Sequence, residues 1–330
     1  MSGHEKVVPT PATPGADGAA PSTTRLEGGA PAAPRRARSA IGAGYLFVAP
    51  ALTLIAVFFL LPVAASFLLS LTDFDIYAVA NRANLRFVGA QNYAALLRDA
   101  LFWVALRNTV YFVVVAGPLS VAASLAAALL VTSGVVRLKS AFRTLFFLPV
   151  VTSLVAVAVV WRYLYHPRFG LLNYALGWAG LGPLDWLGDP RLAMPAIILM
   201  SVWKNFGFNM VIFMAGLQAI PERLYEAARL DGASAAQQLR HVTLPMLIPT
   251  MVFVVLMTTI GHFQLFAEPY VMTQGGPGHS TLSLVLYMYE EGFRWWSLGY
   301  AAALAFVLFA IILAVTLLTR VGGAVGNRRT

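Results

Sequence analysis

Six long apolar stretches dominate the chain and limit the folds that are open to it. They cover residues 45–71, 108–131, 144–163, 193–220, 247–267 and 299–319. A helix needs about 20 apolar residues to cross the hydrocarbon core of a bilayer. The chain is 59% hydrophobic and only 11% charged, whereas soluble domains carry about 25% charged residues. We therefore predict an all-α integral membrane protein with six transmembrane helices.

The distribution of basic residues predicts the orientation of these helices. If the N-terminus is cytoplasmic, fourteen of the 23 lysines and arginines fall inside, eight fall outside, and Lys204 lies within a span. An excess of Lys and Arg in cytoplasmic loops is typical of membrane proteins. With six spans, both termini are then cytoplasmic. The net charge of +9 is thereby explained without a nucleic acid partner.

Composition divides the chain into three parts. Residues 1–40 are rich in Pro, Ala, Gly and Ser, and this composition predicts a disordered cytoplasmic tail rather than a signal peptide. Residues 41–320 form the predicted membrane domain, and residues 321–330 a short cytoplasmic C-terminal tail. The chain contains no cysteine, which excludes disulfides, thiol catalysis and thiolate metal sites.

A polar segment, residues 221–245, separates the fourth and fifth apolar stretches. Pro221 suits the first position of a helix, and Glu222 follows in the first turn, where negative charge is favoured. Gly232 suits a left-handed C-terminal cap, after which a second helix should run until Pro245. The pattern predicts a hairpin of two short helices on the cytoplasmic face.

The spacing within this hairpin resembles a known motif. Glu226-Ala227-Ala228 is followed after three residues by Gly232, then after nine residues by Val242, and after one more by Leu244-Pro245. This resembles the EAA loop of permease subunits in binding-protein-dependent ABC importers, with valine where isoleucine is usual. "FVGAQNYAALL" (87–97) and "TQGGPGHSTLSLVLYMYEEGF" (273–293) are similar to the carbohydrate branch of that family, of the maltose and glycerol-phosphate permease types.

The resemblance implies a type I ABC importer permease fold and an EAA loop that docks into an ATPase. The implied coupling residues are Glu226, Ala227, Ala228, Asp231, Gly232, Leu244 and Pro245. The implied partners are two ATPase subunits, a second homologous permease and an extracytoplasmic solute-binding protein that delivers a carbohydrate-like substrate. The implied location is the bacterial inner membrane, with membrane lipid around the spans.

The chain itself is not expected to be an enzyme or to bind a cofactor. It has only three lysines, and none lies in a glycine-rich loop that could hold phosphates. ATP and Mg²⁺ are therefore expected on the partner ATPase.

Polar residues within spans are candidates for a substrate pathway, because they are costly in a bilayer. The candidates are Lys204, Asn205, Asn209, Gln264 and Glu268. We expect Lys204 and Glu268 to lie close together near the outer end of the pathway. Alternatively, Lys204 extends to the interface and the two asparagines bond between helices. His262 is expected to be a packing residue with satisfied hydrogen bonds, and Trp161, Trp203, Trp295 and Trp296 an interfacial belt rather than sugar platforms.

Three alternatives remain at this point. An ion-gradient-driven secondary transporter should show inverted repeats and carboxylates near the midplane, neither of which is evident. An intramembrane enzyme should carry a recognisable catalytic motif, and none is present. An ABC importer permease for a non-sugar solute is also compatible with the EAA loop.

Overall fold

The computed structural model describes residues 47–81, 84–133 and 136–327. The predicted disordered tail, residues 1–40, lies outside them. The chain divides into two compact units, residues 1–57 and 58–330, and the described part of the first, residues 47–57, is helical. Apart from an isolated antiparallel bridge between Thr72 and Phe87, the regular structure of the described ranges is helical. The predicted all-α class is confirmed for this part of the chain.

Four unbroken helices are long and apolar enough to cross a membrane: Phe47–Ser70, α5 (Ala100–Thr132), α9 (Ala193–Gln218) and the part of α16 (Leu298–Asn327) up to Thr319. Counting two bent helix pairs, the described residues hold up to six candidate spans. α5 begins eight residues before its predicted start, because the Asp99 side chain accepts a hydrogen bond from Leu101 N and caps the helix. α16 continues to Asn327, so the expected C-terminal tail begins within a helix.

The third predicted span is not one continuous helix. α6 (Lys139–Val151) and α7 (Leu154–Leu164) meet at an angle of 99°. Pro149 lies inside α6, and Thr152 has an extended backbone at its end. The Thr152 hydroxyl donates to the Pro149 carbonyl oxygen at 2.6 Å. The helix ends two residues after Pro149, where the backbone becomes extended, and its last carbonyl oxygens are left without helical partners.

The fifth predicted span also differs from expectation. α13 (Ile248–Phe263) ends four residues earlier than expected, and a separate short helix, α14 (Ala267–Met272), follows after a break. The preceding helical stretch, Ala235–Met246, meets α13 at 65°. Glu268 therefore belongs to a helix of its own rather than to the end of a span.

Two π-helical turns precede prolines within helices. η1 (Ala56–Leu60) lies just before Pro62, and η3 (Leu239–Thr243) just before Pro245. In each case the wider turn contains the residue four positions before the proline, whose carbonyl would otherwise meet the proline ring. The local widening lets the helix continue, so Pro245 does not end the hairpin's second helix as predicted.

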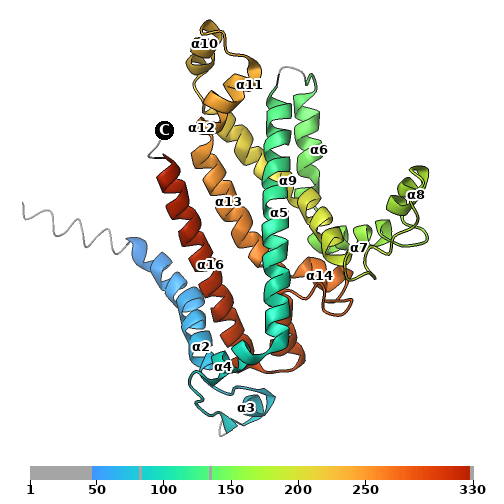
Figure 1. The fold of residues 1–330 in the computed structure, drawn as a ribbon. Coiled ribbons are helices and arrows are strands. Elements are labelled where there is room, and N and C mark those ends of the chain that lie inside the picture. The colour runs from blue at the N-terminus through green and yellow to red at the C-terminus, as the bar shows by residue number, and fades with distance from the viewer. Residues whose placement is uncertain (1–46, 82–83, 134–135, 328–330) are drawn as a thin grey trace, which may run out of the picture. The chain divides into compact units, whose positions relative to one another are not determined.

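Figure 1 shows how the helices of residues 58–327 pack against one another. α5 lies along α9 and also contacts α13, which packs against α16; α6 packs on α9, and α16 on α2 (Leu61–Ser70). One end carries α10 (Glu222–Leu230), α11 (Ala235–Gln238), the end of α5, the start of α6 and the C-terminal end of α16 (Figure 1). Within residues 58–327, the described segments that were expected to be cytoplasmic thus gather at the same end.

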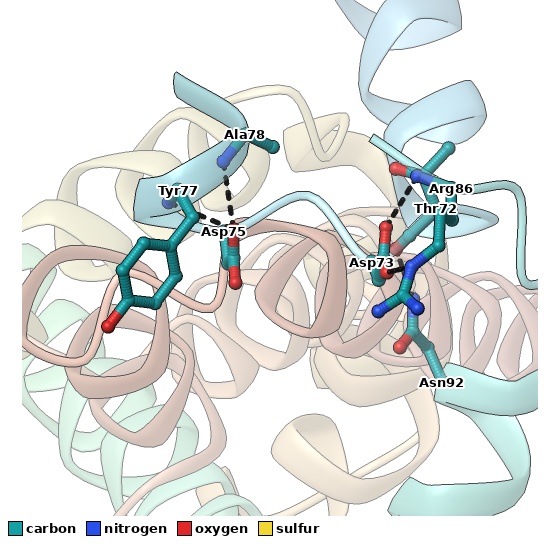
Figure 2. A network of polar contacts seen from close by, with 7 residues as sticks. All are labelled: Thr72, Asp73, Asp75, Tyr77, Ala78, Arg86 and Asn92. Carbon is teal, nitrogen blue, oxygen red and sulfur yellow. Dashed lines mark hydrogen bonds and ion pairs between the residues drawn. The ribbon is translucent and has the colours of Figure 1, made fainter. Parts of the chain in front are cut away.

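The opposite end carries α3 (Ile76–Ala80) and α4 (Gln91–Arg98) (Figure 1), and α15 (Leu284–Tyr289) packs on α5 and α16. Figure 2 shows the polar contacts that order the loop after α2. Arg86 donates from its backbone N and its Nε to Asp73, at 2.7 and 2.8 Å. These bonds, from the Arg86 backbone first, hold the pKa of Asp73 below its usual value. Asn92 Nδ2 donates to the carbonyl oxygens of Ser70 and Thr72, both at 2.8 Å, and joins α4 to the end of α2.

Candidate functional site

The hairpin after α9 is built by local capping interactions. Pro221 is the N-cap of α10 rather than its first helical residue, with an extended backbone, and Glu222 begins the helix. At the other end Gly232 has φ +78°, as predicted. Its N–H donates to the Arg229 carbonyl oxygen at 3.0 Å, and the Ala233 N–H to that of Ala228 at 2.9 Å. This pair of bonds is the Schellman cap, which requires a left-handed residue at the glycine position.

The second half of the hairpin is held by a capping box and one contact between its helices. Ser234 caps α11, and the Gln237 side chain bonds back to the Ser234 N–H at 2.8 Å. Tyr225 of α10 and Thr243 of η3 share a hydrogen bond of 3.0 Å between their hydroxyls. The hairpin is therefore a fixed shape, although it packs little of its surface on the rest of the chain.

The exposed face of the hairpin contains most of the residues that resemble a docking motif. Glu226, Ala227, Asp231 and Gly232 are exposed, while Ala228, Leu244 and Pro245 are half-buried. Leu230, at the tip, is 89% exposed. A single exposed leucine is common on a protein surface and does not by itself identify a binding site.

A cavity of about 530 Å³ lies between α9, α13 and the break between α6 and α7. Ser201 and Phe208 line it from α9, while Val150 and Leu154 line it from the two sides of the break. All five predicted pathway residues also line it: Lys204, Asn205, Asn209, Gln264 and Glu268. The volume falls in the range of small-molecule sites, about 300–1,000 Å³.

Lys204 and Glu268 face this cavity from different elements. Lys204 is the twelfth of 26 residues in α9, close to the middle of the helix rather than to its outer end. Its Nζ donates to the Val150 carbonyl oxygen at 3.1 Å, one of the acceptors left free where α6 ends. Both residues are 7% exposed. None of the ion pairs found in the described ranges joins them directly.

Of the two asparagines, only Asn209 makes the hydrogen bond between helices that was considered for both. Asn209 Nδ2 donates to the Thr258 hydroxyl at 2.9 Å and thereby links α9 with α13. Asn205 Nδ2 bonds within α9, to the Ser201 carbonyl oxygen at 3.0 Å. Both also line the cavity, so a role in packing and contact with a solute are compatible.

His262 differs from its expectation as a satisfied packing residue. It packs edge-on against Phe112, with ring centroids 5.1 Å apart. Its Nδ1 is buried and finds no hydrogen-bond partner in the described part of the chain, and the ring lines the cavity. Sequence reasoning missed its place there, as it missed Ser201 and Thr258. Ser201 lies three and four residues before Lys204 and Asn205 on α9, so helical spacing puts it on their face. Thr258 and His262 lie four residues apart on α13, which contains none of the predicted residues.

Two further expectations concern metals and tryptophans. No group of three or more potential ligands gathers to hold a metal ion within residues 47–81, 84–133 and 136–327. Trp161 and Trp203 contact each other, with ring centroids 5.4 Å apart, and line a separate apolar cavity of about 810 Å³ at the bend of α6 and α7. They are therefore not stacking platforms in the polar cavity.

Apolar helices long enough to cross a membrane, a polar cavity among them and a rigid hairpin beyond one end define a membrane transport protein. Comparison with known families agrees. The chain belongs to the family of binding-protein-dependent transport system inner membrane components, whose pattern matches residues 120–323. It is thus a multi-pass membrane protein and a permease subunit of an ABC transporter rather than an enzyme, as the EAA spacing predicted.

Similar proteins include several carbohydrate permeases. The chain is 38% identical to the lactose transport system permease protein LacF of Rhizobium radiobacter, over 83% of this chain and 92% of that one. It is 35% identical to the trehalose/maltose transport system permease protein MalF of Thermococcus litoralis, over 83% and 91%. A solved bacterial ABC transporter that imports alginate has the same fold, with a TM-score of 0.73 at 21% identity, over 88% of this chain and 99% of that one.

Proposed function

We propose that this chain is the permease subunit of an ATP-driven importer for a sugar or sugar-like solute in the bacterial inner membrane. An extracytoplasmic solute-binding protein delivers the solute, and ATP and Mg²⁺ bind to separate ATPase subunits. The observation that carries the proposal is the polar cavity, because it lies within a chain whose relatives include permeases named for lactose and for trehalose and maltose.

The lining of the cavity supports a polyhydroxylated solute. Asn205 and Gln264 offer amide donors and acceptors, and the buried His262 Nδ1 needs a partner. Phe208 and Phe266 add apolar faces that suit the carbon side of a sugar ring. The Lys204–Glu268 pair has no direct ion pair to break, so a solute hydroxyl can bond to either charge.

The hairpin supports coupling to a motor on another chain. A rigid helix pair transmits force only if it is fixed internally, and the Schellman cap, the capping box and the Tyr225–Thr243 bond fix this one. Leu230 and Glu226 lie on its exposed surface. Docking of this surface into an ATPase would turn closure of two ATPase subunits into a rigid-body movement of the helices, with a second homologous permease completing the pathway.

The test is reconstitution of the assembled importer. Tagged chain is purified from its host, co-purifying proteins are identified, and the assembly is placed in proteoliposomes with ATP inside. We expect an ATPase subunit to co-purify and radiolabelled oligosaccharide to enter only with both ATP and the solute-binding protein. Uptake driven by an ion gradient without ATP would contradict the proposal and favour a secondary transporter. ATP-driven uptake of amino acids but no sugar would contradict the substrate class alone.

A further inference from the structure

A second, smaller cavity lies at the end of the helices opposite the hairpin. It measures about 270 Å³ and is bordered by the start of α5, the start of α9 and the loop before α15. Its polar lining consists of Arg107, Asn108 and Tyr111 on α5, Arg191 just before α9, and Ser280 in the loop. Three segments distant in sequence thus place two guanidinium groups around one small space.

The two arginines have no carboxylate partner there. Neither Arg107 nor Arg191 takes part in the ion pairs found in the described residues. Asp189, two residues before Arg191, accepts a hydrogen bond from the Arg191 backbone N–H at 2.8 Å instead. Two like charges around one cavity repel each other, and an anion between them removes that cost.

Ser280 adds an independent indication of a ligand. Its hydroxyl oxygen is buried, lines the cavity and has no hydrogen-bond partner within the ranges that the structure describes. A buried hydroxyl without a partner is costly. An anionic oxygen in the cavity would accept from it and from the guanidinium groups together.

The loop that carries Ser280 is held firmly against α5. Asn108 Nδ2 donates to the carbonyl oxygens of His279 and Leu282, at 2.8 and 3.0 Å. His279 has φ +61°, an uncommon conformation for a residue with a side chain, and such conformations gather at functional sites. The Ser280 hydroxyl therefore has a fixed place at the edge of the cavity.

The size of the cavity selects the kind of ligand. At about 270 Å³ it lies below the volume of typical small-molecule sites, about 300–1,000 Å³. It has room for one anionic group but not for an oligosaccharide. Arginine binds carboxylates through two parallel hydrogen bonds. The structure thus favours a carboxylate carried by a larger partner.

The position of the cavity relative to the membrane indicates which kind of partner carries the carboxylate. Arg107 lies 25 residues before the end of α5, or about 37 Å along the helix at 1.5 Å per residue, farther than the hydrocarbon core is thick, about 30 Å. With the hairpin in the cytoplasm, the cavity is outside the membrane. The apolar lining consists of Met194, Pro190 and Pro195, which offer no long groove for the acyl chain of a lipid.

We propose that Arg107, Arg191 and Ser280 form a receptor for one aspartate or glutamate side chain on the surface of the solute-binding protein. This inference rests on the proposed function and adds to it a specific anchor point on this chain. The carboxylate would accept from both guanidinium groups and from the Ser280 hydroxyl. Docking would then be sensitive to ionic strength, because the arginines are exposed in the free chain.

The experiment measures ATP hydrolysis by the reconstituted importer as its solute-binding protein is titrated, at low and high salt. R107Q, R191Q and S280A are compared with R98Q, which removes an exposed charge of the same end outside the cavity. We expect each arginine variant to raise the half-saturating concentration of binding protein about tenfold, as loss of a charged contact does, and to weaken its salt dependence. R98Q should leave the half-saturating concentration and its salt dependence unchanged.

Each variant is first checked for monodispersity in size-exclusion chromatography. R107K and R191K, which keep the charge, should recover part of the affinity.

Each possible result of this experiment either supports or overturns the proposed carboxylate site. Unchanged half-saturation in R107Q and R191Q, with normal stimulation of the unmodified importer, would overturn the inference and leave the proposed function intact. A change in the variants that follows the anionic lipid content, at fixed binding protein, would also overturn it and assign the site to a headgroup. Failure of the binding protein to stimulate the unmodified importer would contradict the proposed function and the inference together. Recovery of R191E by an acidic-to-basic change on the binding protein would identify the anchoring carboxylate.

Discussion

At the scale of single residues, two glycines are required for different physical reasons. Gly232 has φ +78°, and a Cβ placed there would meet nothing within 4 Å. Only its backbone conformation demands glycine. Gly207 lies in the middle of α9, where a Cβ would lie 2.0 Å from the Phe146 carbonyl oxygen of α6. There the demand is for space between two helices.

We predict that G232V uncouples ATP hydrolysis from uptake while the chain still inserts into the membrane. A side chain in the left-handed region costs about 1–2 kcal/mol, and a β-branched one more, so the Schellman cap opens and the hairpin loses its shape. The measurement is sugar uptake per ATP hydrolysed in proteoliposomes. G177V, at an open glycine without a positive φ, is the matched control, and G232N should keep more coupling because asparagine tolerates this conformation. Normal coupling in G232V would contradict the prediction.

We predict that G207A destabilises the packing of α6 on α9. Since the new methyl group would overlap a backbone carbonyl, one helix must shift, at a cost of about 1–3 kcal/mol. Thermal unfolding of the purified chain in detergent, followed by loss of monodispersity, should show a lower midpoint. G261A, on a neighbouring helix where a Cβ meets nothing within 4 Å, should remain close to the unmodified chain. Equal stability of the two variants would show that the close approach is not needed.

The sequence predicted the five residues of the cavity because a charge or amide within an apolar stretch has few other uses. It did not predict the acceptor of Lys204. That acceptor is the Val150 carbonyl oxygen, which is free only because α6 ends at Val151. A backbone break has no side-chain signature beyond Pro149, and the prolines inside α5 and inside the helical stretch Ala235–Met246 do not break those helices. The place of His262 was missed for another reason, because it depends on how α13 and α9 face each other.

At the scale of elements, one carboxylate joins three helices at the end opposite the hairpin. Asp99 caps α5 through Leu101 N at 2.9 Å and accepts hydrogen bonds from the hydroxyls of Tyr287 and Tyr300, on α15 and α16. Burial alone would raise the pKa of Asp99, but these hydrogen bonds outweigh it and hold that pKa below the usual 3.8.

We predict an acid-sensitive contribution to stability from this junction. A carboxylate with a lowered pKa in the folded state stabilises fully above the unfolded value of 3.8, and its contribution is lost as pH falls through the lower folded value. When unfolding midpoints are measured at successively lower pH from pH 6, the midpoint should therefore decrease once the pH is lower than about 4. D99N should lower stability at pH 6 by about 1 kcal/mol and show a shallower acid loss. D231N should keep both near those of the unmodified chain, because no side-chain hydrogen bond to Asp231 is found in the described residues. An acid loss in D99N as steep as in the unmodified chain would place its origin elsewhere.

At the scale of the whole family fold, the cavity and the hairpin lie on the same two helices. α9 carries Lys204 in its middle and leads into α10, and α13 follows the hairpin and carries His262. A movement of the hairpin therefore acts directly on two walls of the cavity, without a longer chain of contacts. The sequence predicted this order of segments, because the apolar stretches and the EAA spacing are local. It could not predict the 99° bend of α6 and α7, which closes a third wall.

We predict that the hairpin faces the cytoplasm and that the loop after α2 faces outward. The chain has no cysteine, so single-cysteine variants report one position each. L230C, at a residue 89% exposed, and Y77C, at one 70% exposed, lie at opposite ends of the helices. A membrane-impermeant maleimide applied to spheroplasts should label Y77C at once and L230C only after permeabilisation, because fourteen of the basic residues would otherwise lie on the wrong side. Both should react in detergent, which shows that neither thiol is hidden.

In the assembled importer L230C should react more slowly than in the isolated permease, because the docked ATPase covers Leu230. Labelling of L230C in intact spheroplasts would reverse the topology, and equal reactivity with and without the ATPase would remove Leu230 from the docking surface.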